Sequence, residues 1–108
     1  MPADAAVVCL VTTPPDRADD IAESLVAERL AACVNIVAQV RSIYRWEGEL
    51  ERDDEALLVV KTTQAAIPAL EDQLRRIHPY DTFELVAVEV ADGAPAYLRW
   101  IAESVGAA

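Results

Sequence analysis

A chain of 108 residues has room for one domain and is too short for two. Hydrophobic residues make up 54% of it, which excludes a disordered polymer and predicts a packed core. The formal net charge of −10 provides no basic surface for nucleic acid or anionic lipid, so we expect neither kind of partner.

Cysteine content and terminal sequence indicate the compartment. Cys9 and Cys33 lie in apolar segments and are too few for a secreted disulfide scaffold, so we expect free thiols in the core. The first residues lack the basic segment of a signal peptide. The longest apolar run, residues 5–11, is far shorter than the ~20 residues that cross a bilayer. We therefore expect a cytoplasmic protein without a membrane span.

The first half of the chain predicts a strand, a helix and a long strand. The valine-rich run at 5–11 is typical of a strand buried on both faces. A helix is expected next, with a capping-box-like start at Asp16. From Cys33 to Glu47 the apolar period becomes two, which predicts a strand, and its length predicts a bulge between Val37 and Arg41. The helix is expected to bury five apolar residues: Ala18, Ile21, Ala22, Leu25 and Val26.

Alternation in the long strand predicts its two faces. Even positions from Val34 to Trp46 carry no charge, whereas odd positions include arginine and glutamine. We therefore expect the even positions to share one covered face. Gly48 permits a reversal, and the acidic segment 47–55 is interpreted as a solvated hairpin tip.

The second half predicts strands at 56–60 and 85–90 with a helix between them at about 66–77. Pro79 prevents this helix from continuing, and Pro95 opens a short final helix. Strand–helix–strand–strand–helix–strand is the order of the split βαβ, or ferredoxin-like, α+β fold, here with an extra C-terminal helix. We expect a single domain over residues 1–108, with an antiparallel sheet and helices on one face.

The second face of this sheet is the basis for expecting self-association. The strands at 5–11, 56–60 and 85–90 lack clean polar alternation, so both of their faces are apolar. Leaving ~500 Å² of such surface wet forfeits ~12 kcal/mol at about 25 cal/mol per Å². A whole domain is stable by only about 5–15 kcal/mol. Further copies of the chain are therefore expected to cover this face.

His78, the only histidine, is the first candidate for chemistry. It fits equally a structural role at a helix C-terminus and a role as a ligand for copper or zinc. A metal site would need more ligands, from Glu84, Asp81 and a symmetry-related chain. Neither a nucleophile elbow, a P-loop nor a dinucleotide fingerprint is present, so we expect no enzyme and no organic cofactor.

Aromatic pairs and one lysine are candidates for the wall of a ligand cleft. Tyr44 and Trp46 share a strand face, and Tyr97 and Trp100 lie one helical turn apart. Packing in the core or at an interface is the alternative for these four residues. Lys61, at the end of an apolar strand, fits either a structural ion pair or a cleft.

Five segments in one order resemble a known family: Glu28–Asn35, Ser42–Gly48, Leu57–Thr62, His78–Tyr80 and Tyr97–Trp100. Over residues 7–105 the chain resembles the CutA family of divalent-cation tolerance proteins. The resemblance implies a ferredoxin-like fold, an interlocked homotrimer with sheet packing between subunits, and a link to copper. It also implies clefts between subunits, lined by residues that match Tyr44, Trp46, Lys61, His78, Tyr80, Glu84, Tyr97 and Trp100.

The chain departs from the family pattern at three positions. Phe83 stands where proline is frequent, and Glu49 stands where a basic residue is common. Thr12 occupies the position where some members carry a cysteine, so a copper site here would lack that thiolate. His78 and Glu84 would then have to suffice.

The leading hypothesis is a cytoplasmic, non-enzymatic homotrimer for metal tolerance. It would bind a divalent metal, best copper(II), through His78 and Glu84. The alternative is a signalling trimer whose clefts bind a small organic or nucleotide ligand with the help of Lys61. An acylphosphatase-like hydrolase is disfavoured, because Thr12–Asp16 offers prolines and an acid instead of an anion-binding loop.

Overall fold

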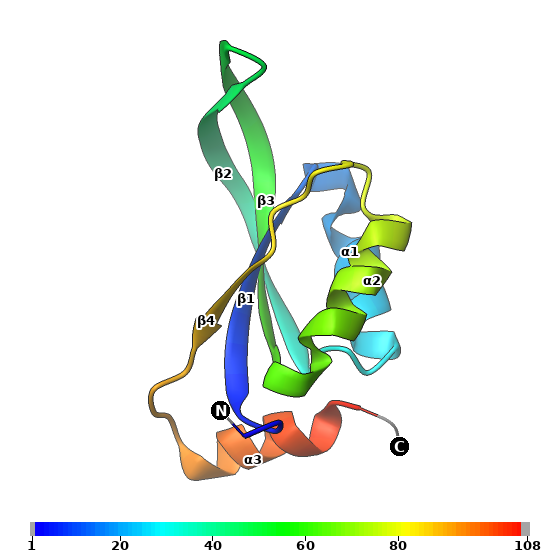
Figure 1. Ribbon diagram of the computed structural model, residues 1–108, viewed down its shortest axis with the longest axis vertical. Coiled ribbons are helices and arrows are strands. Elements are labelled where there is room, and N and C mark those ends of the chain that lie inside the picture. The colour runs from blue at the N-terminus through cyan, green and yellow to red at the C-terminus, as the bar shows by residue number, and fades with distance from the viewer. Residues whose placement is uncertain (1, 107–108) are drawn as a thin grey trace.

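The computed structural model describes residues 2–106, which form a four-stranded sheet and three α-helices (Figure 1). The strands are β1 (Ala6–Thr13), β2 (Cys33–Trp46), β3 (Glu49–Thr63) and β4 (Val86–Glu89). The helices are α1 (Ala18–Ala27), α2 (Ile67–Ile77) and α3 (Pro95–Ser104). The predicted α+β fold class is confirmed. None of the helices in residues 2–106 is long and apolar enough to span a bilayer.

The sheet has the order β2-β3-β1-β4, and every neighbouring pair is antiparallel. Each strand–helix–strand unit therefore spans a strand of the other unit, as the split βαβ order requires. Helices α1 and α2 lie on one face, and α3 lies across the lower end of the sheet (Figure 1). The β2–β3 hairpin extends beyond the other strands and lengthens the molecule to 44 Å along its longest axis.

The core lies between the sheet and the helix pair. Alternate residues of β1 and β3 point toward α1 and α2, because side chains of a strand alternate between faces. Cys9 is among them, and its burial raises the pKa of its thiol to about 11, which makes it an unreactive core residue. The fully buried large side chains include Val7, Val11, Ile21, Leu25, Leu58, Val60, Leu70 and Leu74.

Prolines set the limits of α2 as predicted. Pro68 lies in the first turn, where its missing N–H costs no helical hydrogen bond. The helix ends at Ile77, and His78 already has extended backbone angles before Pro79.

Three expectations for the first half of the chain are wrong. Asp16 lies in a short 3₁₀ turn (Pro15–Arg17), and α1 begins at Ala18 without a side-chain cap. Val26 is 41% exposed, because it faces a groove beside the edge strand β2 and not the sheet interior. The acidic segment 49–55 is mostly exposed, as predicted, but it is strand and not turn, since it pairs with β2 along its whole length. Only Glu47 and Gly48 form the turn, both with positive φ, as a two-residue hairpin turn requires.

The predicted bulge in β2 is present, and it changes the assignment of faces. Val37 pairs with Leu57 but Val40 pairs with Glu55, so β2 contains one extra residue between them. One extra residue reverses which side chains point to which face. The expectation that all even positions of β2 share a face is therefore wrong. Val34 and Ile36 lie on the helix side, whereas later even positions lie on the opposite side.

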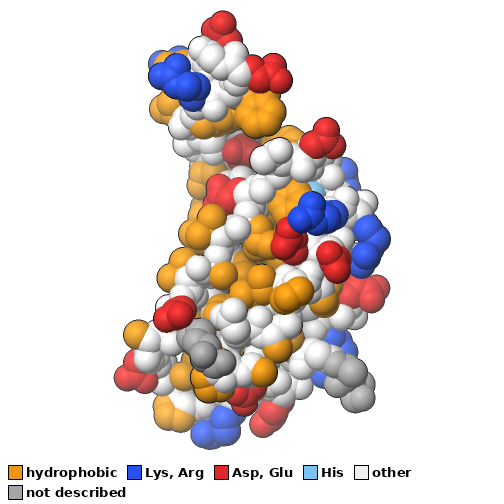
Figure 2. Space-filling view, in the orientation of Figure 1, with side chains coloured by type: hydrophobic (Ala, Val, Ile, Leu, Met, Phe, Trp, Pro, Cys, Tyr) orange, Lys and Arg blue, Asp and Glu red, His pale blue; other side chains and the backbone are white. Residues whose placement is uncertain are grey.

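The sheet face opposite α1 and α2, which we call the open face, is largely apolar. Its central residues are Val8, Leu10, Val59, Val86 and Val88. Val86 and Val88 are 51% and 49% exposed. Figure 2 shows hydrophobic side chains gathered along the strands over much of the length of the molecule. This uncovered surface is the feature that the sequence predicted for self-association.

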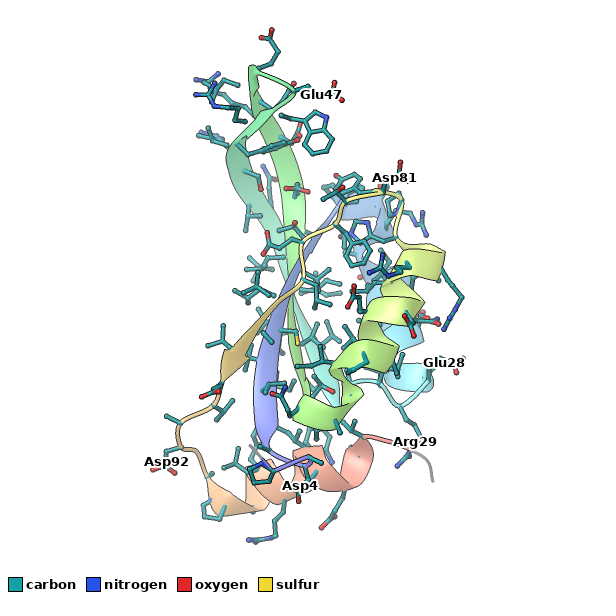
Figure 3. All side chains as sticks on the ribbon, in the orientation of Figure 1. Asp4, Glu28, Arg29, Glu47, Asp81 and Asp92 are labelled. Atoms are coloured by element: carbon teal, nitrogen blue, oxygen red, sulfur yellow. The ribbon has the colours of Figure 1, made fainter. Side chains whose placement is uncertain are left out.

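The lower end of the fold is joined to the C-terminal region by Arg29. Its guanidinium donates to the carbonyl oxygens of Gly106, at 2.5 Å, and of Glu103, at 3.3 Å. Gly106 in turn donates its backbone N–H to the Arg29 carbonyl. Figure 3 shows Arg29 beside the end of α3. These contacts hold α3 against the sheet.

The burial pattern predicts unequal effects of two truncations. Replacing fully buried Leu58 by alanine leaves a cavity and should lower the free energy of unfolding by about 2–5 kcal/mol. The control V26A, on the helix surface, should lower it by less than about 1 kcal/mol. Urea unfolding at one fixed protein concentration measures both values. Equal losses would contradict this description of the core.

Candidate functional site

The strand register places three of the candidate residues, Tyr44, Trp46 and Lys61, on the open face. Beyond the bulge, Tyr44 pairs with Glu51 and Trp46 pairs with Glu49. Before the bulge, Cys33 pairs with Lys61 on the same face. The face therefore has an upper end near the hairpin and a lower end near α3.

His78 lies at the upper end and is only 8% exposed. The backbone N–H of Tyr80 donates to His78 Nδ1 at 3.1 Å, so Nδ1 carries no proton. His78 Nε2 therefore carries the proton and donates to the Thr12 carbonyl oxygen at 2.9 Å. The ring stacks on Phe83 with centroids 5.3 Å apart. A metal can bind this imidazole only if it replaces one of the two hydrogen bonds.

Glu84 also contacts Thr12, through the threonine side chain. Thr12 Oγ1 donates to Glu84 Oε1 at 3.4 Å, so Thr12 contacts both proposed ligands. Asp81 is exposed in the loop after α2 (Figure 3). Within residues 2–106, no three His, Cys, Asp or Glu side chains are grouped closely enough to hold a metal ion. One protomer therefore does not supply a complete set of metal ligands.

Two tyrosine hydroxyls at the upper end donate hydrogen bonds to carboxylates of β3. Tyr44 donates its hydroxyl to Asp53, and Tyr80 donates to Glu55 Oε2 at 3.3 Å. The hydrogen bond to Asp53, together with nearby carboxylates, raises the pKa of Tyr44 to about 12. Burial, followed by the charge of Glu55, raises the pKa of Tyr80. The upper end thus combines aromatic rings with negatively charged carboxylates. Trp46 adds a half-exposed ring to it.

The lower end has the opposite character. Lys61 donates to Asn35 Oδ1, and the Cys33 thiol lies 3.9 Å from the same oxygen. Burial raises the pKa of Tyr97, and contact with Cys33 contributes to this shift. Tyr97 stacks on Trp100 with ring centroids 5.6 Å apart. This end therefore combines an ammonium group, an amide and a phenol.

The structure divides the predicted site residues between these two ends. Along β1, Thr12 marks the upper end and Val8, which pairs with Lys61, marks the lower end. Four residues of extended strand separate them by about 13 Å. His78, Glu84, Tyr80, Tyr44 and Trp46 belong to the upper end, and Lys61, Tyr97 and Trp100 to the lower end.

Sequence reasoning missed several contact residues at both ends. The pairing of distant strands brings them to the site, and no local motif marks them. The sequence marks Thr12 as the position of an absent cysteine and Cys33 as a core residue, and neither feature predicts these contacts. One signal for Cys33 and Asn35 is available in the sequence. Side chains alternate along β2 and the alternation reverses at the bulge, so odd positions before it share a face with even positions after it. The residues concerned are Thr12, Cys33, Asn35, Asp53 and Glu55.

Comparison with protein families identifies relatives across nearly the whole chain. The family model described as "CutA1 divalent ion tolerance protein" matches residues 7–104. A divalent-cation tolerance protein CutA of Thermus thermophilus is 50% identical over 100 residues, which cover 92% of this chain and 97% of the relative.

Solved structures agree with this fold. The structure of the Thermus thermophilus protein has a TM-score of 0.91 at 49% identity, covering 94% of this chain and 99% of that one. CutA1 of Oryza sativa has a TM-score of 0.92 at 36% identity, covering 96% of each chain. A structure named as the periplasmic divalent cation tolerance protein CutA of Archaeoglobus fulgidus has a TM-score of 0.89 at 32% identity, covering 94% and 99%.

The Tyr44–Asp53 contact predicts an alkaline titration. Tyr44 should lose its proton near pH 12, above the ordinary value of 10.0, so its stabilising hydrogen bond persists below pH 10 and is lost as the pH rises through 12. The substitution D53N should move the last tyrosinate midpoint toward 10, whereas E23Q on α1 should not move it. Tyrosinate absorbance measures the midpoints, with circular dichroism to monitor folding. An unchanged last midpoint in D53N would contradict the assignment.

Proposed function

Because this chain belongs to the CutA1 divalent ion tolerance family, we propose that it acts in metal tolerance as a homotrimer that binds a divalent cation. Copper(II) is the best candidate metal. The family consists of tolerance proteins and not of enzymes. The observation that carries the proposal is that His78 and Glu84 both contact Thr12, at the upper end of β1.

Both the open face and the sheet edges support the homotrimer. Strands β2 and β4 are the two edges of the sheet. Burial of the apolar open face against other copies would remove Val86 and Val88 from water. A head-to-tail contact between the unlike edges β2 and β4 would form a ring if its rotation closes, whereas a two-fold dimer would pair like edges.

The donor chemistry at the upper end supports copper. An imidazole beside carboxylates suits Cu(II), which stands at the top of the divalent affinity series. His78 and Glu84 are the proposed ligands, and water or an adjacent protomer would complete the set. Tyr44, Trp46 and Tyr80 would form the wall of the cleft.

The proposed compartment is the cytoplasm. This proposal rests on the two cysteines, which are too few for a secreted disulfide scaffold. The family does not fix the compartment, because the Archaeoglobus relative is named as periplasmic.

A second candidate function is the binding of a small organic ligand on the open face. Lys61 favours it, because its ammonium group lies on that face with an amide oxygen as its hydrogen-bond acceptor. A thermal-shift screen of organic acids and nucleotides separates this candidate from metal binding.

The trimer predicts a specific sensitivity to charge on the open face. Wild type should sediment at three times the protomer mass of 11.7 kDa. V88D should dissociate, because assembly would bury its carboxylate. V26D places the same charge on a similarly exposed valine of α1 and should leave the trimer intact. Sedimentation equilibrium at micromolar concentration tests this, and a stable 11.7 kDa wild-type species would exclude the trimer.

Metal binding predicts that copper affinity depends on two side chains. H78A and E84Q should each lower the affinity for Cu(II) at least about tenfold, whereas E23Q should leave it unchanged. Acidification should weaken binding, because protons compete with the metal for the imidazole. Calorimetric titration of Cu(II) measures the affinities, and circular dichroism verifies folding. E84Q preserves both His78 hydrogen bonds, so it tests the site even if H78A unfolds. If both variants bind Cu(II) with the same isotherm as wild type, His78 and Glu84 are not the metal ligands.

A further inference from the structure

We propose that the side chains of Lys61 and Asn35 at the lower end of the open face bind a carboxylate group. The inference deepens the second candidate function by naming the chemical class of its ligand. Both side chains come from one protomer, so the site does not depend on the metal ligands and, for a free acid, does not depend on the trimer.

Lys61 carries a charge without an opposite charge beside it. Within residues 2–106 the one ion pair is that between Arg75 and Glu71 on α2. Lys61 is partly buried, and its cross-strand partners are Val8 and Cys33. An ammonium group in partly apolar surroundings loses hydration, and a bound anion compensates for that loss.

The side-chain NH₂ group of Asn35 is a second hydrogen-bond donor beside Lys61. Its Oδ1 accepts from Lys61 Nζ and faces the Cys33 thiol, so the remaining polar group of this amide is its NH₂. Lys61 Nζ has two further N–H groups after its bond to Asn35. Together they offer adjacent donors, which suit the two oxygens of a carboxylate.

The charges around the two ends distinguish an anion site from a cation site. The upper end holds Asp53 and Glu55 in addition to the candidate metal ligand Glu84. No carboxylate is a cross-strand partner of Lys61 or Asn35, although the chain has 19 acidic residues. The lower end is therefore suited to a negatively charged group and is about 13 Å of strand away from the metal candidates.

The carboxylate can belong to a free organic acid or to an acidic residue of a second copy. A free acid would bind to the existing protein and raise its melting temperature. A carboxylate from a second copy would already be in place, so Lys61 would contribute to assembly. The experiment separates these two sources.

The test measures melting temperature and calorimetric affinity with sodium acetate and sodium succinate, against sodium chloride of equal ionic strength. Wild type should be stabilised by the acids, and K61M should lose affinity at least about tenfold. N35D places a carboxylate beside Lys61, so it should melt at a higher temperature without ligand and no longer respond to acids. The control R99M, which removes an exposed cation of α3, should respond like wild type.

Each remaining outcome has one interpretation. If acids have no effect but K61M weakens the trimer in sedimentation, the second copy supplies the carboxylate. An equal response to acids in wild type and K61M, or no effect of K61M on either measurement, would overturn the proposal. If the acids and the K61M substitution both have no effect but a nucleotide stabilises the protein, the chain binds an organic ligand without Lys61 and the carboxylate site is excluded.

Discussion

The register shift in β2 is the constraint on which the arrangement of this molecule depends. One extra residue between Val37 and Val40 reverses the faces of the strand. Without it, Tyr44 and Trp46 would lie on the side of the helices, away from Lys61. With it, one continuous face extends from the lower end of the sheet to the hairpin. The pairing of β2 with β3 beyond Val40 follows from that single irregularity.

The open face is divided into regions of different chemistry. Its centre is apolar, its upper end carries carboxylates and tyrosines, and its lower end carries an ammonium group and an amide. The net charge of −10 describes the whole chain but not this local separation. A cation and a carboxylate would therefore bind about 13 Å apart on one face without competing for the same side chains.

His78 combines a structural role with its proposed role in metal binding. Its ring joins the loop after α2 to β1, through Tyr80 on one side and Thr12 on the other. A metal would exchange one of these hydrogen bonds for a coordinate bond. Metal binding and the position of this loop would thus be coupled, because the same nitrogen serves both.

The sequence by itself determined the order of elements, the helix end at Ile77 and the position of the bulge, because prolines and apolar periodicity act locally. It also marked His78, Glu84 and the aromatic residues as candidates, which the resemblance to a family reinforced. Only the tertiary structure decided which face each residue of β2 occupies, since parity beyond a bulge depends on pairing with β3. It alone brought Asn35 to Lys61 and Thr12 to His78, because these residues are far apart in the chain and meet only in the folded protein.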